Sequence, residues 1–324
     1  MLICLEALWR DLPIIDFHHH LNPALTRLPE KPSTSYAHGI PVSTEHKGLT
    51  HVDAHIELMD ETGIDISVLT SGSGMRGELK LARVANESLA KVCREHEDRF
   101  RFLAHAAPLD GEDTLNEVKR FLEMCPGAAI PSAFGEIGLD DPRLDPLYEL
   151  LESNGKFLFI HPAITTNEAE AKFYNELDLY RTVGREFSLV MATTKLICGG
   201  VLDKHPGLQV VMAHLGGGIS SLVPRIVHYQ DKEMWGVAHD PIHGRTAKEP
   251  FENYLKRIYF DTGGFFGDER VIKIALQCIP KDRILLGTDY PQEIRDAEPI
   301  KVLVSQMRSL SMEKNGSNLL RLSS

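Results

Sequence analysis

Residues 15–20 read Ile15-Asp-Phe-His18-His-His20, a short apolar, β-rich run that ends in a cluster of imidazoles. Alternate side chains of a strand point the same way, so we expect His18 and His20 to project together. Two imidazoles placed in this way can chelate one divalent ion. Among 15 histidines, however, a His-x-His pair is a weak signal by itself, and a solvated loop accounts for it equally well.

Three further apolar runs end in a polar side chain that is followed by a Pro- or Gly-containing turn. They are Phe-Ile-His161-Pro, Met-Ala-His214-Leu-Gly-Gly-Gly and Gly-Thr-Asp289-Tyr-Pro. The fold must bring the ends of these separate runs together. A parallel β/α barrel does so, because the carboxyl ends of its strands meet at one face, where function gathers.

Eight short apolar runs are bounded by turn residues, and eight is the strand number of a TIM barrel. The strand candidates are Pro13–Phe17, Ile66–Thr70, Phe100–Ala106, Ala128–Ala133, Lys156–Ile160, Leu208–Ala213, Arg257–Phe260 and Arg283–Leu286. Helical patterns between them cover Glu78–Glu97, Asp113–Met124, Leu144–Asn154, Glu168–Phe187, Thr193–Lys204 and Asp268–Cys278. This alternation predicts an α/β fold, a (β/α)8 TIM barrel of the metal-dependent hydrolase type. The fourth candidate has the weakest pattern, because it contains a proline and few β-branched residues.

Two segments lack clear periodicity. Asn22–Thr50 is rich in Pro, Ser and Thr, and His228–Asn253 is irregular and contains histidines. We expect both to be long loops over the catalytic face. With no linker, repeat or low-complexity tract, residues 1–324 are expected to form a single TIM-barrel domain.

The formal net charge of −11 argues against a nucleic-acid partner, because phosphate binding needs a concentrated basic face. If the substrate is an acid, its attraction must come locally, from a metal or a few arginines. Five cysteines without a CxxC or disulfide-like spacing favour a reduced, cytoplasmic setting. No apolar run is long enough to span a membrane, so no membrane association is expected.

Imidazoles and one carboxylate at the strand ends make a typical open site for zinc or a similar divalent ion. His214 has two interpretations. It could be a buried structural histidine, or a proton donor or acceptor beside the metal, with Gly216–Gly218 allowing a substrate to approach closely. A phosphate-binding loop is disfavoured, because the Gly and Lys spacing of a P-loop is missing.

Carboxylates near these motifs are also candidates. Asp16 points away from the histidine pair and is expected to be structural or to support the ligands from behind. Asp261, in Tyr-Phe-Asp-Thr-Gly-Gly, either lines the site, orients a histidine or anchors a loop. Glu136 is equally ambiguous, while His55 and His105 are expected to be structural or exposed.

The motifs around His18, His20, His161, His214 and Asp289, in this order and over nearly the whole chain, resemble the amidohydrolase-related family of aminocarboxymuconate semialdehyde decarboxylase. The resemblance implies one divalent metal ion, usually zinc and sometimes manganese, held by the first three histidines and Asp289. It makes His214 the acid/base residue. An alternative is a mononuclear hydrolase of a lactone or amide, with Asp289 as base, and a third is a barrel that only binds or scaffolds.

Members of that family are mostly non-oxidative decarboxylases, so the resemblance implies a lyase that acts on a small aromatic or unsaturated carboxylic acid. Many are homodimers in which an arginine, here Arg225, reaches the neighbouring subunit's substrate. Phe265, Phe266 and Tyr290 could flank an aromatic ring, and Asp261 could contact the substrate. The semialdehyde decarboxylase carries basic residues where this chain has His55 and Glu57, so that particular substrate is not assigned. A binuclear site is disfavoured, because the run Ala128–Ala133 offers no lysine for a carbamate bridge.

Overall fold

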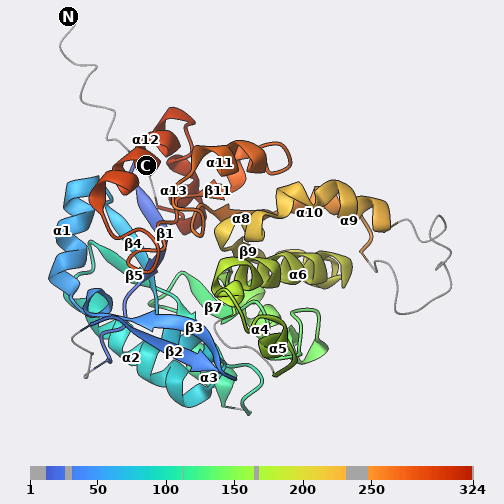
Figure 1. The fold of residues 1–324 in the computed structure, drawn as a ribbon, viewed down its shortest axis with the longest axis horizontal. Helices are drawn as coiled ribbons and strands as arrows, with labels where there is room; N and C mark the ends of the chain where they lie inside the picture. The colour runs from blue at the N-terminus through green and yellow to red at the C-terminus, as the bar shows by residue number, and fades with distance from the viewer. Residues whose placement is uncertain (1–11, 26–30, 112, 164–167, 231–246, 323–324) are drawn as a thin grey trace, which may run out of the picture.

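The structure, a computed structural model, describes residues 12–25, 31–111, 113–163, 168–230 and 247–322 (Figure 1). Its parallel strands form two sheets, one of order β1-β4-β5 and one of order β11-β10-β9-β8-β7-β6. The strands are β1 (Ile15–His20), β4 (Ile66–Thr70), β5 (Phe100–Phe102), β6 (Ala104–His105), β7 (Gly127–Pro131), β8 (Phe157–His161), β9 (Gln209–Met212), β10 (Ile258–Asp261) and β11 (Ile284–Leu285). Every one of the eight predicted runs therefore overlaps a strand.

Backbone hydrogen bonds join the two sheets at both ends. One residue separates β5 from β6, so Phe100–His105 is a single strand that pairs first with β4 and then with β7. On the other side, Phe17 N donates to Leu286 O at 2.8 Å and Asp289 N donates to His18 O at 2.9 Å. Eight parallel strands are thus linked in a ring, and the predicted α/β TIM barrel is confirmed.

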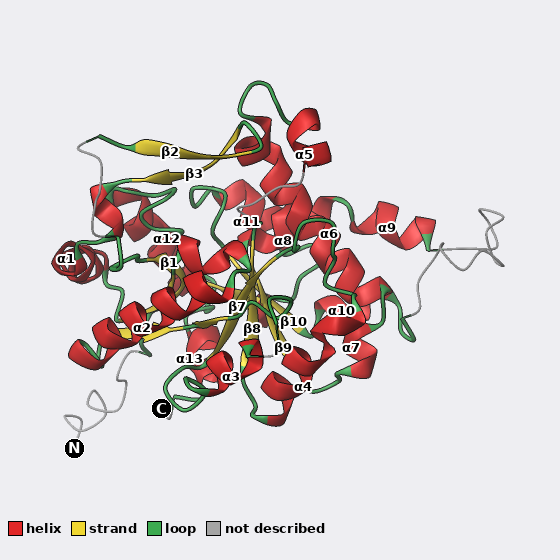
Figure 2. Cartoon of the chain, turned by 90° about the horizontal axis from the view of Figure 1, so that it is seen from below, coloured by secondary structure: helices red, strands yellow, loops and turns green. Residues whose placement is uncertain are grey.

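Helices connect the strands and cover the outside of the ring (Figure 2). They are α1 (Val52–Thr62), α2 (Leu79–Glu95), α3 (Thr114–Lys119), α4 (Asp145–Ser153), α5 (Glu168–Phe173), α6 (Arg185–Cys198), α7 (Val201–Lys204), α9 (Val223–Tyr229), α10 (Phe251–Leu255), α11 (Glu269–Ala275), α12 (Ala297–Ser309) and α13 (Lys314–Leu320). The short segment α8 (His214–Gly218) has left-handed backbone. Within the described ranges, the helices are too short or too polar to cross a membrane.

The predicted break between helical patterns after Phe187 is wrong. Helix α6 runs without interruption from Arg185 to Cys198, because Leu189 and Val190 bury their side chains on its inner face. The interruption lies earlier, where Tyr180–Gly184 forms one wide π-helical turn that leads directly into α6. That turn decides which residues at the start of α6 face the barrel mouth.

The prediction that Asn22–Thr50 is an irregular loop is wrong. It contains an antiparallel hairpin of β2 (Ser33–Ala37) and β3 (Ile40–Glu45), which lies to one side of the ring in Figure 2. Ile40 and Val42, two residues apart on β3, are both buried against Tyr180. The hairpin thus forms because a distant part of the chain covers its apolar face. Of His228–Asn253, residues 231–246 lie outside the described ranges.

Candidate metal centre

His18 and His20 lie on β1, and His161 ends β8, so the ring brings three imidazoles from two strands to one point. Their relative exposure is 5% or less. The Nε2 atoms of His18 and His20 are 3.1 Å apart, and those of His20 and His161 are 3.2 Å apart. All three Nε2 atoms therefore face one small volume at the barrel mouth.

Asp289 follows β11 and adds a carboxylate to the same volume. Its Oδ1 atom lies 2.9 Å from Nε2 of His20 and 3.6 Å from Nε2 of His18. Its φ of 52° is in the left-handed region that a residue with a side chain seldom adopts. The hydrogen bond from Asp289 N to His18 O holds this conformation, so the backbone aims the carboxylate at the histidines.

The outward ring nitrogen of each histidine has a partner that fixes the ring. His18 Nδ1 donates to Asp261 Oδ2 at 3.1 Å, and His161 Nδ1 donates to the Pro162 carbonyl at 2.7 Å. His20 Nδ1 lies 3.0 Å from Thr70 Oγ1. With the protons on Nδ1, the Nε2 lone pairs converge on each other and on Asp289, an arrangement that needs a cation to be stable.

The distances fit one divalent ion. Two nitrogen ligands about 2.1 Å from a tetrahedral ion are about 3.4 Å apart, close to the 3.1 and 3.2 Å between these Nε2 atoms. Asp289 Oδ1 is buried and has no hydrogen-bond partner among the described residues, as expected for a metal ligand. Three imidazoles and a carboxylate are the donors that zinc and related divalent ions accept.

His214 lies beside this cluster, and its ring stacks on that of His18 with centroids 5.0 Å apart. Its Nε2 is buried, has no described hydrogen-bond partner and lies 3.4 Å from Asp289 Oδ2. Its Nδ1 is 2.9 Å from Glu186 Oε1, on α6. One ring nitrogen is therefore held from behind by a carboxylate, while the other faces the site.

Burial and charge act in opposite directions on these groups. Burial alone would lower the pKa of His214, but Glu186 and Asp289 outweigh it and raise that pKa well above its usual value. Burial, with His20 and His18 nearby, puts the pKa of His161 well below normal. The pKa of Asp289 is also well below normal, because His18, His20 and His214 overcome the effect of its burial. Thus His161 is neutral, as a ligand must be, and His214 can hold a proton.

The glycines after His214 serve packing rather than the substrate approach that the sequence suggested. Gly217 has a φ of 69°, and a Cβ there would overlap the backbone carbonyl of Glu186. Gly264 has a φ of 81°, and a Cβ there would overlap the His214 ring. Glycine at these positions lets α6 and the loop after β10 close on His214 from two sides.

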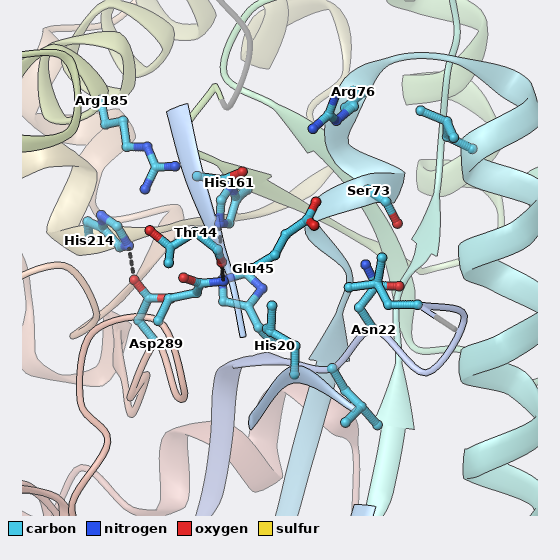
Figure 3. A pocket seen from close by; sticks show the side chains of 17 residues that line it. His20, Asn22, Thr44, Glu45, Ser73, Arg76, His161, Arg185, His214 and Asp289 are labelled. Atoms are coloured by element: carbon cyan, nitrogen blue, oxygen red, sulfur yellow. Dashed lines mark hydrogen bonds and ion pairs between the residues drawn. The ribbon is translucent and has the colours of Figure 1, made fainter. Parts of the chain in front are cut away.

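A cavity of about 290 Å³ opens above the cluster (Figure 3). The hairpin supplies one wall through Ser43, Thr44 and Glu45. Among the described residues, those that line the cavity are His20, Leu21, Asn22, Leu25, Ser43, Thr44, Glu45, Leu49, Gly72, Ser73, Arg76, Leu81, His161, Arg185, His214, Asp289 and Gln292. Most of its exposed wall is apolar and a few polar groups converge, which suits a small organic acid.

The predicted substrate-contacting residues lie elsewhere. Asp261 is fully buried behind His18, where it also accepts from His214 N at 3.1 Å, so it supports the cluster and does not line the cavity. Tyr290 packs on the rings of His19 and His55, and Phe265 packs against the core. These two aromatic side chains follow strands as predicted, but neither lines the cavity.

Arg225 lies on α9, outside the cavity, and is exposed, with its guanidinium 4.7 Å from the centre of the Tyr229 ring. Asp16 accepts from both the backbone and the hydroxyl of Thr288, which agrees with the structural role expected for it. His55 is buried and contacts His19 and the Gly48 carbonyl.

Among the cavity or site residues that the sequence did not predict are Glu186, Arg185 and Arg76. Arg76 ends the 3-10 turn η3 (Gly72–Arg76), just after β4, so its place after a strand end was an available signal. Glu186 and Arg185 begin a helix and belong to no recognisable motif.

Comparisons with known proteins agree with this geometry. The model of a family described as amidohydrolase matches residues 15–300. The chain is 28% identical, over 78% of its length and 70% of the relative's, to 2-amino-3-carboxymuconate-6-semialdehyde decarboxylase of Dictyostelium discoideum. It is 26% identical to gamma-resorcylate decarboxylase of Rhodococcus jostii, over 74% of this chain and 77% of that protein.

Among solved structures, 5-carboxyvanillate decarboxylase from Novosphingobium aromaticivorans is similar, with a TM-score of 0.77 and 26% identity. The match covers 85% of this chain and 82% of that one. That structure contains manganese and 4-hydroxy-3-methoxy-5-nitrobenzoic acid.

Proposed function

The chain belongs to the amidohydrolase family, and we propose that it is a metal-dependent, non-oxidative decarboxylase of small aromatic or unsaturated carboxylic acids. One observation carries this proposal: His214 directs Nε2 into the site, beside three converging Nε2 atoms and a carboxylate, under a cavity the size of a small acid. The relatives named above are decarboxylases of acids of this kind, which supports the assignment.

We assign His18, His20, His161 and Asp289 as the ligands of the metal ion. The resemblance favours zinc, whereas the 5-carboxyvanillate decarboxylase structure contains manganese, so both ions belong in the test. When bound, the ion would supply positive charge that binds and orients the substrate carboxylate and stabilises negative charge during the reaction. Asp261, Thr70 and Pro162 would keep the ligand rings in the tautomer that binding requires.

His214 is the proposed proton donor. From Nε2 it protonates the substrate carbon that bears the carboxylate, and the bond to the carboxylate then breaks. The electron pair of that bond returns to the ring or the conjugated system, and carbon dioxide leaves. Glu186 accepts a hydrogen bond from Nδ1–H and stabilises the charged imidazole, which favours the protonated form of His214 that the step requires.

The homodimer and the cytoplasmic location remain predictions. In the proposed dimer, Arg225 would reach towards the neighbouring subunit's cavity, which is compatible with its exposed position outside its own. We assign no substrate contact to Phe265 or Tyr290, because neither lines the cavity.

The test is a screen of hydroxybenzoates and unsaturated acids for carbon dioxide release, with zinc and manganese supplied separately. We expect turnover with at least one ion, and loss of turnover in His214→Asn with the metal content unchanged. Hydrolysis of lactones or amides without carbon dioxide release from any acid would instead support the hydrolase alternative.

A further inference from the structure

The cavity above the metal centre contains two arginines that the proposed reaction does not use. Arg185 lies at the start of α6, and Arg76 ends the turn η3 after β4. Both side chains are half-buried and line the cavity. Neither forms an ion pair with any carboxylate in the described part of the chain, although the protein has a net charge of −11. A partly desolvated guanidinium without an ion-pair contact is costly unless a ligand supplies one.

Arg185 is held in place but keeps donors free. Its Nη2 donates to the Val42 carbonyl of the hairpin, which fixes the side chain against β3. Its Nε is buried and has no hydrogen-bond partner among the residues described. A guanidinium with a fixed stem and a buried, free N–H is prepared to bind an anion through paired hydrogen bonds.

The two guanidinium groups enter the cavity from opposite sides. In Figure 3 they lie above the cluster of His20, His161 and Asp289, with Arg185 on the left, near His214, and Arg76 on the right. A substrate whose reacting carboxylate lies at the metal centre would therefore extend its far end into the space between the two arginines.

Glu45 is the acidic side chain on this part of the wall, and Ser35 Oγ donates to it at 3.3 Å. The two arginines together outweigh its single negative charge, so an additional acid group can be accommodated. If either arginine lost its charge, Glu45 would cancel the other and the second acid group would lose its net attraction.

We propose that Arg185 and Arg76 together bind a second acid group at the far end of the substrate, so that the preferred substrates are dicarboxylic acids. This inference rests on the proposed decarboxylase function and specifies its substrate class. Charge-assisted hydrogen bonds of this kind should favour a diacid over the matching monoacid by about 10- to 100-fold in kcat/KM.

Three matched ligands test the inference with manganese-loaded protein. They are salicylate, the salicylate derivative with a second carboxylate para to its hydroxyl group, and the same derivative with a neutral carboxamide there. We expect the diacid to bind and turn over about 10- to 100-fold better than the amide. Arg185→Gln and Arg76→Gln should each remove most of this preference, measured in each variant as the ratio of kcat/KM for the diacid to kcat/KM for the amide. Lys91→Gln, an equal charge change on the exposed face of α2, should preserve the preference.

Affinity is measured by calorimetry and turnover by carbon dioxide release. The two measurements distinguish a failure of the diacid inference from a failure of the proposed decarboxylase function. Equal affinity and turnover for diacid and amide, with salicylate decarboxylated, would overturn the inference and leave the decarboxylase function standing. Arginine-dependent binding of the diacid, without release of carbon dioxide from any of the three acids, would support the binding site and count against the function. If both variants also lose salicylate turnover and unfold at lower temperature, Arg185→Lys, which keeps the charge, must restore the diacid preference or the inference fails.

Discussion

Nδ1 of His214 lies 2.9 Å from Oε1 of Glu186, although 28 residues separate them in the chain. The contact joins the left-handed segment after β9 to the first turn of α6. It determines which ring nitrogen faces the metal centre, and it raises the pKa of His214 against the effect of burial. Helix α6 carries none of the proposed metal ligands, yet through Glu186 it orients His214, the proposed proton donor, and raises its pKa.

Glu186→Gln should therefore slow turnover without removing the metal. The amide keeps the shape of the side chain but cannot stabilise a charged imidazole, so we expect kcat to fall about 10- to 100-fold. Metal content, measured by elemental analysis, should not change, because Glu186 contacts His214 and none of the four proposed ligands. Glu95→Gln, an exposed change on α2, is the matched control. Undiminished kcat in the Glu186 variant would show that this carboxylate is only structural.

Gly217→Ala should disturb the same contact through the backbone. The new Cβ would overlap the Glu186 carbonyl and would sit at a φ of 69°, which alone costs about 1 to 2 kcal/mol. We expect a lower melting temperature and a lower kcat, because α6 must move away from His214. Gly39→Ala, at a φ of 84° but with open space around its Cβ, separates backbone strain from loss of the contact. It should lower the melting temperature while kcat is retained.

The ligand cluster depends on the residues that hold its rings. Asp261→Asn should weaken metal binding about 10- to 100-fold, because His18 Nδ1 would lose the carboxylate that fixes its orientation and basicity. Competition with a coloured chelator measures the change. His161→Ala should have a larger effect and leave less than one ion per chain, whereas His51→Ala, exposed before α1, should match wild type. Stoichiometric, tight metal in His161→Ala would contradict the assigned ligand set.

The barrel and the residues at its strand ends could be predicted because their signals are local. Each short apolar run stops at a turn, and parallel strands bring these ends to one face. His18, His20, His161 and Asp289 each follow such a run, so their convergence required only the correct fold class. Even Ala128–Ala133, the least regular pattern, overlaps β7 (Gly127–Pro131), because β6 and β8 pair with it on both sides.

The missed features depend on contacts between distant parts of the chain. The β2–β3 hairpin exists because Ile40 and Val42 pack on Tyr180, and Arg185 donates to the Val42 carbonyl 143 residues away. The π-helical turn before α6 determines which residues of that helix face the cavity. No sequence rule predicts such a turn. Tyr290 packs on histidines behind the site rather than on a substrate, and only the full geometry decides between two such surfaces.

Two buried histidines outside the ligand set should make the fold sensitive to acid. Burial, with His19 nearby, lowers the pKa of His55 to about 3, and burial, with His20 nearby, lowers the pKa of His105 to about 3. The unfolded chain takes up these protons near pH 6.5 whereas the folded protein does not, so stability is complete above that pH and decreases below it. Each histidine should account for about 2 kcal/mol of unfolding free energy lost between pH 7 and pH 5.

Urea unfolding of wild type and His105→Gln at both pH values measures this effect. In the folded protein His105 Nε2 accepts from Ser71 N at 2.9 Å, a bond that the glutamine oxygen can replace but an imidazolium cannot. The variant should be less stable at pH 7, yet it should lose about 2 kcal/mol less than wild type on acidification, because one titrating group is gone. His51→Gln removes an exposed histidine instead, and its free energy of unfolding should fall between pH 7 and pH 5 by the same amount as in wild type. If wild type and His105→Gln lost the same unfolding free energy between pH 7 and pH 5, His105 would have to accept a proton inside the folded protein, contrary to its hydrogen bonds.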